Sequence, residues 1–233
     1  MKTLKHPLKP MRAIAFYTSI LMAGAGLSQQ AFSQNHQLGD ATFAAASDKS
    51  GANKYWPMPL EIITRYAGYG EYEGFIRSES YHGLESVAAV KTVKWSIRYS
   101  SALAGVQDLT TPTGSLVASP EDWWLAVDAK GDIRVLKFVR AGVTIFEASP
   151  KNTPPVLMPG KLAAGDTWTV FGKTFTVLDL GATLGKDGNL LKLKVAEGNE
   201  FAFDYYAAGR GLVATQEGVD TTSTPSGWAL MKR

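Results

Sequence analysis

The sequence predicts a mainly β protein: an antiparallel meander that forms a twisted sandwich or an open half-barrel, with few or no helices after a signal peptide. Three observations lead to this fold class. Apolar and polar residues alternate over several segments, glycine-rich turn signals separate these segments, and no amphipathic helical pattern follows the leader. In the clearest case, Leu191, Leu193 and Val195 share one face of an extended segment, while Lys192 and Lys194 take the other.

The first 33 residues predict a signal peptide. Basic residues precede a mostly apolar run at 13–27, and Ala31-Phe32-Ser33 has the small-x-small pattern of a cleavage site. The apolar run is too short for a comfortable transmembrane span, although an uncleaved anchor is the alternative. We therefore expect an exported protein, periplasmic or extracellular, without a membrane span in the mature chain.

A single β domain is expected at 55–233. It follows residues 34–54, which are polar and alanine-rich and predict a flexible tail with at most a transient helix around 41–46. The proline-rich segment 150–159 is interpreted as a connector within the domain, because neither half alone has enough strands to close comfortably.

Each half of the domain contains candidate strands. In the first half, the segment 84–100 alternates without a break, with Val93, Trp95, Ile97 and Tyr99 on one face, and it is followed by a long polar loop to residue 120. Further strands are expected at 123–127, 133–140 and 143–147.

In the second half, Gly172-Lys173 is expected to form a two-residue type II′ turn between strands at 167–171 and 174–180. A loop at 181–189 then precedes strands at 191–195 and 201–205. Gly209 and Gly211 permit a sharp bend into a strand that begins with Leu212. A phosphate-binding loop would require a helix at that point.

The run Tyr205-Tyr206-Ala207-Ala208-Gly209-Arg210-Gly211-Leu212-Val213 resembles the Tyr-Ala-x-Gly-x-Gly-Leu-Val signature of uncharacterised bacterial secreted or periplasmic β proteins. The acidic hairpin at 128–132 and the segment 165–168 are similar to parts that precede the signature in those chains. Ala214 stands where a lysine is common. The resemblance covers the second half of the chain and implies a β fold, but it implies no activity.

Charge and cysteine content exclude several classes of function. The chain has 24 basic and 21 acidic residues, and four of the basic residues lie in the leader, so the mature chain has 20 basic and 21 acidic residues. No basic block remains that would indicate a nucleic-acid partner. The absence of cysteine excludes disulfides, thiolate metal sites and cysteine nucleophiles.

Catalytic groups are scarce, so we assign no catalytic residue, metal or cofactor. The three histidines, His6, His36 and His82, are too dispersed for a metal cluster or a catalytic triad, and His82 is expected in a surface turn. Glu71 and Glu73 would share one face of a strand, which leaves a hydrolase of envelope polysaccharide as the alternative. Two aspartates at 128 and 132 are too few for calcium.

Aromatic residues are the most informative candidates for binding. Neighbouring rings in a strand point to opposite faces of the sheet, so an exposed face would offer a stacking platform for a sugar or another flat ligand, and a covered face would be core. The leading hypothesis is a non-enzymatic envelope protein that binds or carries a ligand or a protein partner. A structural or assembly factor that offers an edge strand or the tail is a further alternative. The candidate ligand-binding residues are Trp95, Trp124, Phe203, Tyr205 and Tyr206.

Overall fold

The computed structural model describes residues 36–43, 53–101, 119–217 and 226–231, all within the compact unit Ser33–Arg233. These residues confirm the mainly β fold class, because they form strands and one short 3-10 turn, with no α-helix among them. The signal peptide predicted at 1–33 and most of the loop expected after residue 101 lie outside the described residues. The elements are β1 His36–Leu38, β2 Ala41–Phe43, β3 Ile63–Tyr69, η2 Gly70–Tyr72, β4 Phe75–Val87, β5 Val90–Ser101, β6 Glu121–Val127, β7 Ile133–Arg140, β8 Val143–Glu147, β9 Val156–Met158, β10 Thr167–Val170, β11 Lys173–Leu184, β12 Asp187–Glu197, β13 Glu200–Ala207, β14 Gly211–Glu217 and β15 Gly227–Leu230.

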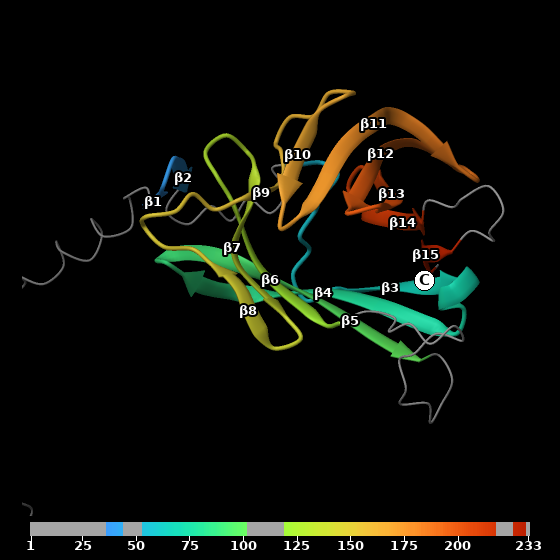
Figure 1. Cartoon of the computed structure of the whole chain (residues 1–233), viewed down its shortest axis with the longest axis horizontal. Helices are drawn as coiled ribbons and strands as arrows, with labels where there is room; N and C mark the ends of the chain where they lie inside the picture. Colours follow the sequence, from blue (N-terminus) through green and yellow to red (C-terminus); the bar gives the residue numbers. More distant parts are fainter. Residues whose placement is uncertain (1–35, 44–52, 102–118, 218–225, 232–233) are drawn as a thin grey trace, which may run out of the picture. The chain divides into compact units, whose positions relative to one another are not determined.

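One antiparallel sheet of 13 strands contains every strand except the hairpin β1–β2. Its path runs β10-β11-β12-β13-β14-β15-β3-β4-β5-β6-β7-β8, and β9 pairs with β7. The last strand, β15, therefore joins the two halves of the chain, because it pairs with β14 on one side and with β3 on the other. Figure 1 shows the green-to-yellow run β4–β8 and the orange-to-red run β10–β14 on either side of this junction.

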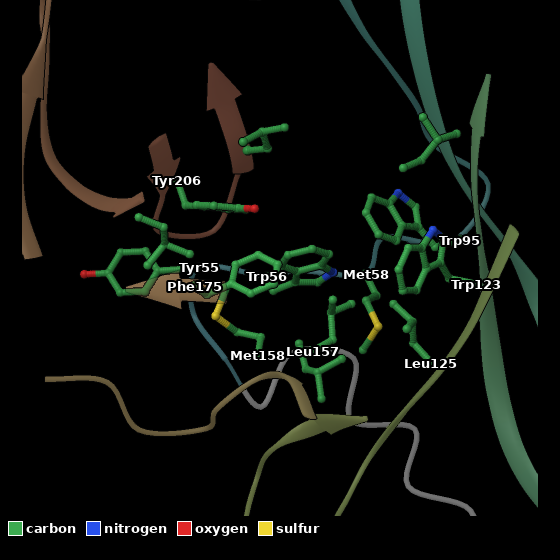
Figure 2. Close-up of a cluster of buried hydrophobic side chains, with 14 of the residues drawn as sticks. Tyr55, Trp56, Met58, Trp95, Trp123, Leu125, Leu157, Met158, Phe175 and Tyr206 are labelled. Carbon is green, nitrogen blue, oxygen red and sulfur yellow. The ribbon is translucent and has the colours of Figure 1, made fainter. Parts of the chain in front are cut away.

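The two runs of strands face each other across an aromatic core. Phe171, in the turn after β10, contacts the rings of Trp123, Phe138 and Phe146 from β6, β7 and β8. Between the runs lies Trp56, from the irregular segment that precedes β3. Its ring meets Trp95 edge-on at a centroid distance of 5.1 Å and stacks on Tyr206 at 5.6 Å (Figure 2). The sheet is therefore held in its curved form by side chains inserted between its halves.

Part of the segment that was expected to be a flexible tail forms a β-hairpin. Residues 36–43 form the hairpin β1–β2, not a helical turn, and Leu38, Ala41 and Phe43 are buried. They pack in a second cluster with Trp124 and Leu136, on the face of β6 and β7 away from the aromatic core, and the Thr42 carbonyl accepts a backbone hydrogen bond from Ala129. The period-two spacing of Ala41 and Phe43 was the available signal for a strand.

Three turns differ from the sequence prediction. The strand expected at 84–100 is two strands, because Ala88 and Ala89 form a tight turn between β4 and β5 with φ of 47° and 65°. Alanine seldom takes positive φ, so no turn signal marked this position. The turn after β10 is Phe171-Gly172, both with positive φ, which matches type I′ and not the expected type II′ at Gly172-Lys173. The loop expected at 181–189 is mostly strand, with the turn at Gly185.

Gly68 is required for the close approach of β3 to the 3-10 turn that follows it. A Cβ atom on Gly68 would lie 2.0 Å from the backbone carbonyl oxygen of Tyr72, so the backbone would have to move. We expect Gly68→Ala to lower the free energy of unfolding by about 1–3 kcal/mol. Gly83→Ala is the matched control, because a Cβ atom there meets nothing within 4 Å. Urea unfolding of both variants checks this, and equal stabilities would contradict it.

Candidate functional site

A cavity of about 440 Å³ lies between the two runs of strands, against the aromatic core. Its wall is contributed by β4, β5, β6 and β7 on one side and by β11, β12, β13 and β14 on the other. Several aromatic rings and a smaller number of polar groups line it. The aromatic residues are Trp56, Trp95, Tyr99, Trp123, Phe171, Phe175 and Tyr206, and the charged residues are Arg77, Glu121, Arg140, Lys173, Glu197 and Asp204.

One charged residue of the wall, Arg77 of β4, forms an ion pair with Glu79, a buried residue of the same strand that does not line the cavity. Arg77 Nη2 donates to Glu79 Oε1 at 2.5 Å, and the two side chains are 14% and 5% exposed. Trp95 Nε1 donates to the second oxygen of Glu79 at 3.3 Å. Burial raises the pKa of Glu79, and the charge and hydrogen bond of Arg77 partly oppose that rise. The charges of Arg77 and Glu79 therefore compensate each other.

Two further basic groups of the wall are also paired. Arg140 Nε donates to Glu121 Oε1 at 2.8 Å, and Trp123 Nε1 donates to Glu121 Oε2 at 3.0 Å. Lys173 Nζ lies 3.6 Å from a carboxylate oxygen of Glu197. The side chains of Lys173 and Glu197 are both substantially exposed, so this ion pair adds little stability.

Asp204 differs from the other carboxylates of the wall. Thr215 Oγ1 donates to its Oδ1 at 2.7 Å and the Tyr206 hydroxyl donates to its Oδ2 at 3.3 Å, but no basic nitrogen of the described residues lies within 4.0 Å. Burial raises the pKa of Asp204, although these hydrogen bonds and the charges of Arg77 and Lys173 act in the opposite direction. Asp204 is thus a half-buried carboxylate that faces the cavity.

The period of the strands explains which residues reach the cavity. On β13, Ala202, Asp204 and Tyr206 point inward, and Phe203 and Tyr205 point to the opposite face. There the ammonium group of Lys192 lies over the rings of Phe203 and Tyr205, at 4.3 Å and 5.4 Å from their centroids. The aromatic side of β13 that carries Phe203 and Tyr205 is therefore the outer side.

The structure separates the predicted ligand-binding residues. Trp95 and Tyr206 line the cavity. Trp124 lies on the other face of β6, where its Nε1 donates to Glu85 Oε2 at 2.6 Å and its ring joins the second cluster. Phe203 and Tyr205 lie on the face of the sheet away from Trp95, because the pairing of β13 with β12 and β14 turns the row of Asp204 and Tyr206 toward the cavity.

Gly209 and Gly211 form the turn between β13 and β14, with φ of 73° and 82°. The amide of Gly209 donates to the Lys54 carbonyl at 2.7 Å. A Cβ atom on Gly211 would lie 3.5 Å from the ring of Pro57, so this turn is packed against the segment that carries Trp56. A strand, not a helix, follows this Gly-x-Gly run, so the backbone has no helix terminus to offer a phosphate.

The residues that were considered for catalysis or metal binding lie outside the cavity wall. Glu71 and Glu73 were expected on one face of a strand, but they lie in and just after the 3-10 turn, exposed to solvent and outside the cavity wall. His82 is exposed and lies 3.0 Å from Ser80 Oγ. Asp128 is buried in an ion pair with Arg134 at 2.5 Å. Within the described residues, no three His, Cys, Asp or Glu side chains gather as metal ligands would.

Sequence reasoning did not find Trp56, Arg77, Asp204 or Thr215. Trp56 lies between the two sheet halves, in an irregular segment without a periodic pattern. The one available signal was Asp204 itself, a carboxylate on the same side of its strand as Tyr206. Whether that side faces the interior is decided by the pairing of β13 with β12 and β14.

The fold and the cavity define an antiparallel β protein with an internal, aromatic-walled pocket. Comparison of the chain with protein-family models, with curated proteins and with solved structures gave no match. The similarity to secreted bacterial β proteins through the Gly-x-Gly signature therefore stays a prediction. Among the described residues, no helix has the length and apolar character needed to cross a membrane.

Proposed function

We propose that this protein is an exported, non-enzymatic β protein of the cell envelope that binds a small ligand in the cavity. The observation that supports this best is the cavity itself, about 440 Å³ with walls of tryptophan, tyrosine and phenylalanine. That volume lies within the range of about 300–1,000 Å³ that is typical of small-molecule sites.

The aromatic walls favour a ligand with a flat or apolar body. Trp56 and Tyr206 stack at an angle of 27° between ring planes, and Trp95 and Trp123 continue the aromatic surface toward β6. Both Trp56 and Tyr206 are almost fully buried, at 6% and 4% exposure, so their positions are already set by packing. A preformed wall of this kind loses little conformational entropy when a ligand binds.

Filling the cavity tests the proposal. Ala202 of β13 lines the cavity, and Ala196 of β12 lies on the opposite face of the same strand pair. We expect wild-type protein to raise the fluorescence of phenylnaphthylamine, a flat apolar probe, with energy transfer from the cavity tryptophans. Ala202→Phe should weaken this binding by about tenfold or more, because the added ring takes the space of the probe, while Ala196→Phe should leave it unchanged.

The two phenylalanine variants make the result interpretable. Both add the same side chain to neighbouring strands, so a general effect on folding would appear in both, and circular dichroism checks that each is folded. If the wild-type protein does not bind the probe, or if both variants bind it equally well, the cavity is not a ligand site. Export is tested separately, by N-terminal sequencing of the protein recovered from the periplasm or the medium.

A further inference from the structure

Asp204 differs from the other carboxylates of the cavity wall, because Glu121 and Glu197 each contact a basic side chain and Asp204 contacts none among the described residues. Asp204 is half-buried, and a carboxylate that loses part of its hydration without contacting a cation destabilises the folded protein. Asp204 receives two hydrogen bonds, from Thr215 and Tyr206, and no ion pair from the described residues. The two hydroxyl groups hold the carboxylate in place, but neither carries a positive charge that would neutralise it.

The nearby basic groups contact other carboxylates, and among the described residues none lies within ion-pair distance of Asp204, although the charges of Arg77 and Lys173 act on it from farther away. Arg77 is paired with Glu79, Arg140 with Glu121 and Lys173 with Glu197. The partner of Arg77, Glu79, is not a lining residue, so Asp204 is the one carboxylate of the cavity wall without an ion pair among the described residues. A cationic group in the cavity would complement Asp204, whereas an anionic group beside it would be repelled.

Aromatic rings lie beside the carboxylate. The Tyr206 hydroxyl contacts Asp204, and the Tyr206 ring stacks on Trp56, which also meets Trp95 (Figure 2). Ring faces attract organic cations, and the attraction is stronger where water is excluded. A carboxylate next to stacked rings is thus suited to an ammonium group attached to an apolar body.

We propose that the ligand of this cavity is an organic amine or ammonium compound, whose cationic group pairs with Asp204 and whose apolar body lies against Trp56 and Tyr206. This inference rests on the proposed function, since it assigns the chemical class of the ligand that the cavity binds. It makes Asp204 the residue that determines specificity, and Thr215 and Tyr206 the residues that position its carboxylate.

Binding of a cation should strengthen as pH rises, because only the ionised carboxylate pairs with it. Burial raises the pKa of Asp204, so its ionisation is displaced to higher pH, and a bound cation would lower that pKa again. The charged and titratable groups that act on Asp204 are Arg77, Glu79, Lys173, Tyr66 and Tyr206. The pKa values of Tyr66, Tyr206 and Arg77 are all raised, so none of these three groups changes its charge near neutral pH.

Three probes of one shape and different charge test the inference: naphthylmethylammonium, naphthylmethanol and naphthoate, all substituted at the same ring position. Each is titrated against full-length mature protein in competition with phenylnaphthylamine, near neutral pH and at lower pH. We expect the ammonium probe to bind about tenfold or more tightly than the alcohol, and the carboxylate probe to bind more weakly than the alcohol. The preference for the ammonium probe should decrease as the pH is lowered.

Asp204→Asn should remove the preference, while Asp179→Asn, which removes an exposed carboxylate outside the cavity wall, should keep it. Equal binding of the three probes to wild-type protein, or tightest binding of naphthoate, overturns the inference and leaves the cavity as a ligand site. If phenylnaphthylamine itself does not bind, the proposed function fails. The wild-type comparison decides the question even if Asp204→Asn does not fold.

Discussion

Arg77→Met is expected to lower the free energy of unfolding by about 3–5 kcal/mol, because it leaves the buried carboxylate of Glu79 without its cation. Arg77 and Glu79 are 14% and 5% exposed, and only the weaker bond from Trp95 Nε1, at 3.3 Å, would remain to Glu79. Methionine fills much of the space of the arginine stem, so the loss reports the broken ion pair more than a cavity.

The double variant Arg77→Met/Glu79→Gln is the matched control. Glutamine keeps an acceptor for Trp95 Nε1 and removes the unpaired charge, so it should recover most of the lost stability. Urea unfolding of the wild type, both single variants and the double variant measures the coupling between the two residues. If the double variant is as unstable as Arg77→Met alone, the charge of Glu79 is not the cause of the loss.

The destabilisation by Arg77→Met should also depend on pH. Burial raises the pKa of Glu79, and the opposing effect of Arg77 is absent from the variant, so the pKa of Glu79 rises further. A carboxyl group with a raised pKa in the folded state favours folding below its unfolded pKa, and this contribution is lost as pH rises through the folded value. The variant should therefore be closer to wild type at about pH 5 than at about pH 8. A deficit that is the same at both values would contradict this.

Trp56→Ala is expected to cost about 3–5 kcal/mol of unfolding free energy, the range for removing a large buried aromatic residue. Trp56 is 6% exposed and contacts rings from both halves of the sheet, Trp95 on β5 and Tyr206 on β13. Its removal would leave those two rings without their common neighbour. Hydrogen exchange should then increase in β5 and β13 together, because one side chain supports both strands.

Trp56→Phe is the control, since it keeps a ring between Trp95 and Tyr206 and removes only part of the volume. We expect it to cost less than half as much as Trp56→Ala. Thermal and urea unfolding check both variants. If Trp56→Ala is as stable as Trp56→Phe, Trp56 does not hold the two halves of the sheet together, and the cavity wall does not depend on it.

The fold class could be predicted because alternation is a local property of the sequence. Leu191, Leu193 and Val195 do share the inner face of β12, and Lys192 and Lys194 share the outer one. Turns were less predictable, since Ala88-Ala89 takes positive φ without glycine or asparagine. Pairing of Val87 with Val90 holds that turn, and pairing is not visible in either residue alone.

The candidate site was predicted only in part. Of the five candidate ligand-binding residues, Trp95 and Tyr206 line the cavity, whereas Phe203 and Tyr205 lie on the face of the sheet away from Trp95. A strand with aromatic residues at consecutive positions has two apolar rows, so its sequence does not say which row is inside. Pairing of β13 with β12 and β14 decides it.

Strand formation, the bend at Gly209 and Gly211 and the absence of cysteine chemistry can all be read from the residues alone. The junction of the two halves at β15, and the cavity that Arg77, Asp204 and Trp56 line together, become visible only in the folded chain. The difference lies in the sequence separation over which each effect acts. Period and turn chemistry act between near neighbours, whereas the cavity is built from residues far apart in sequence, brought together by burial of the aromatic core.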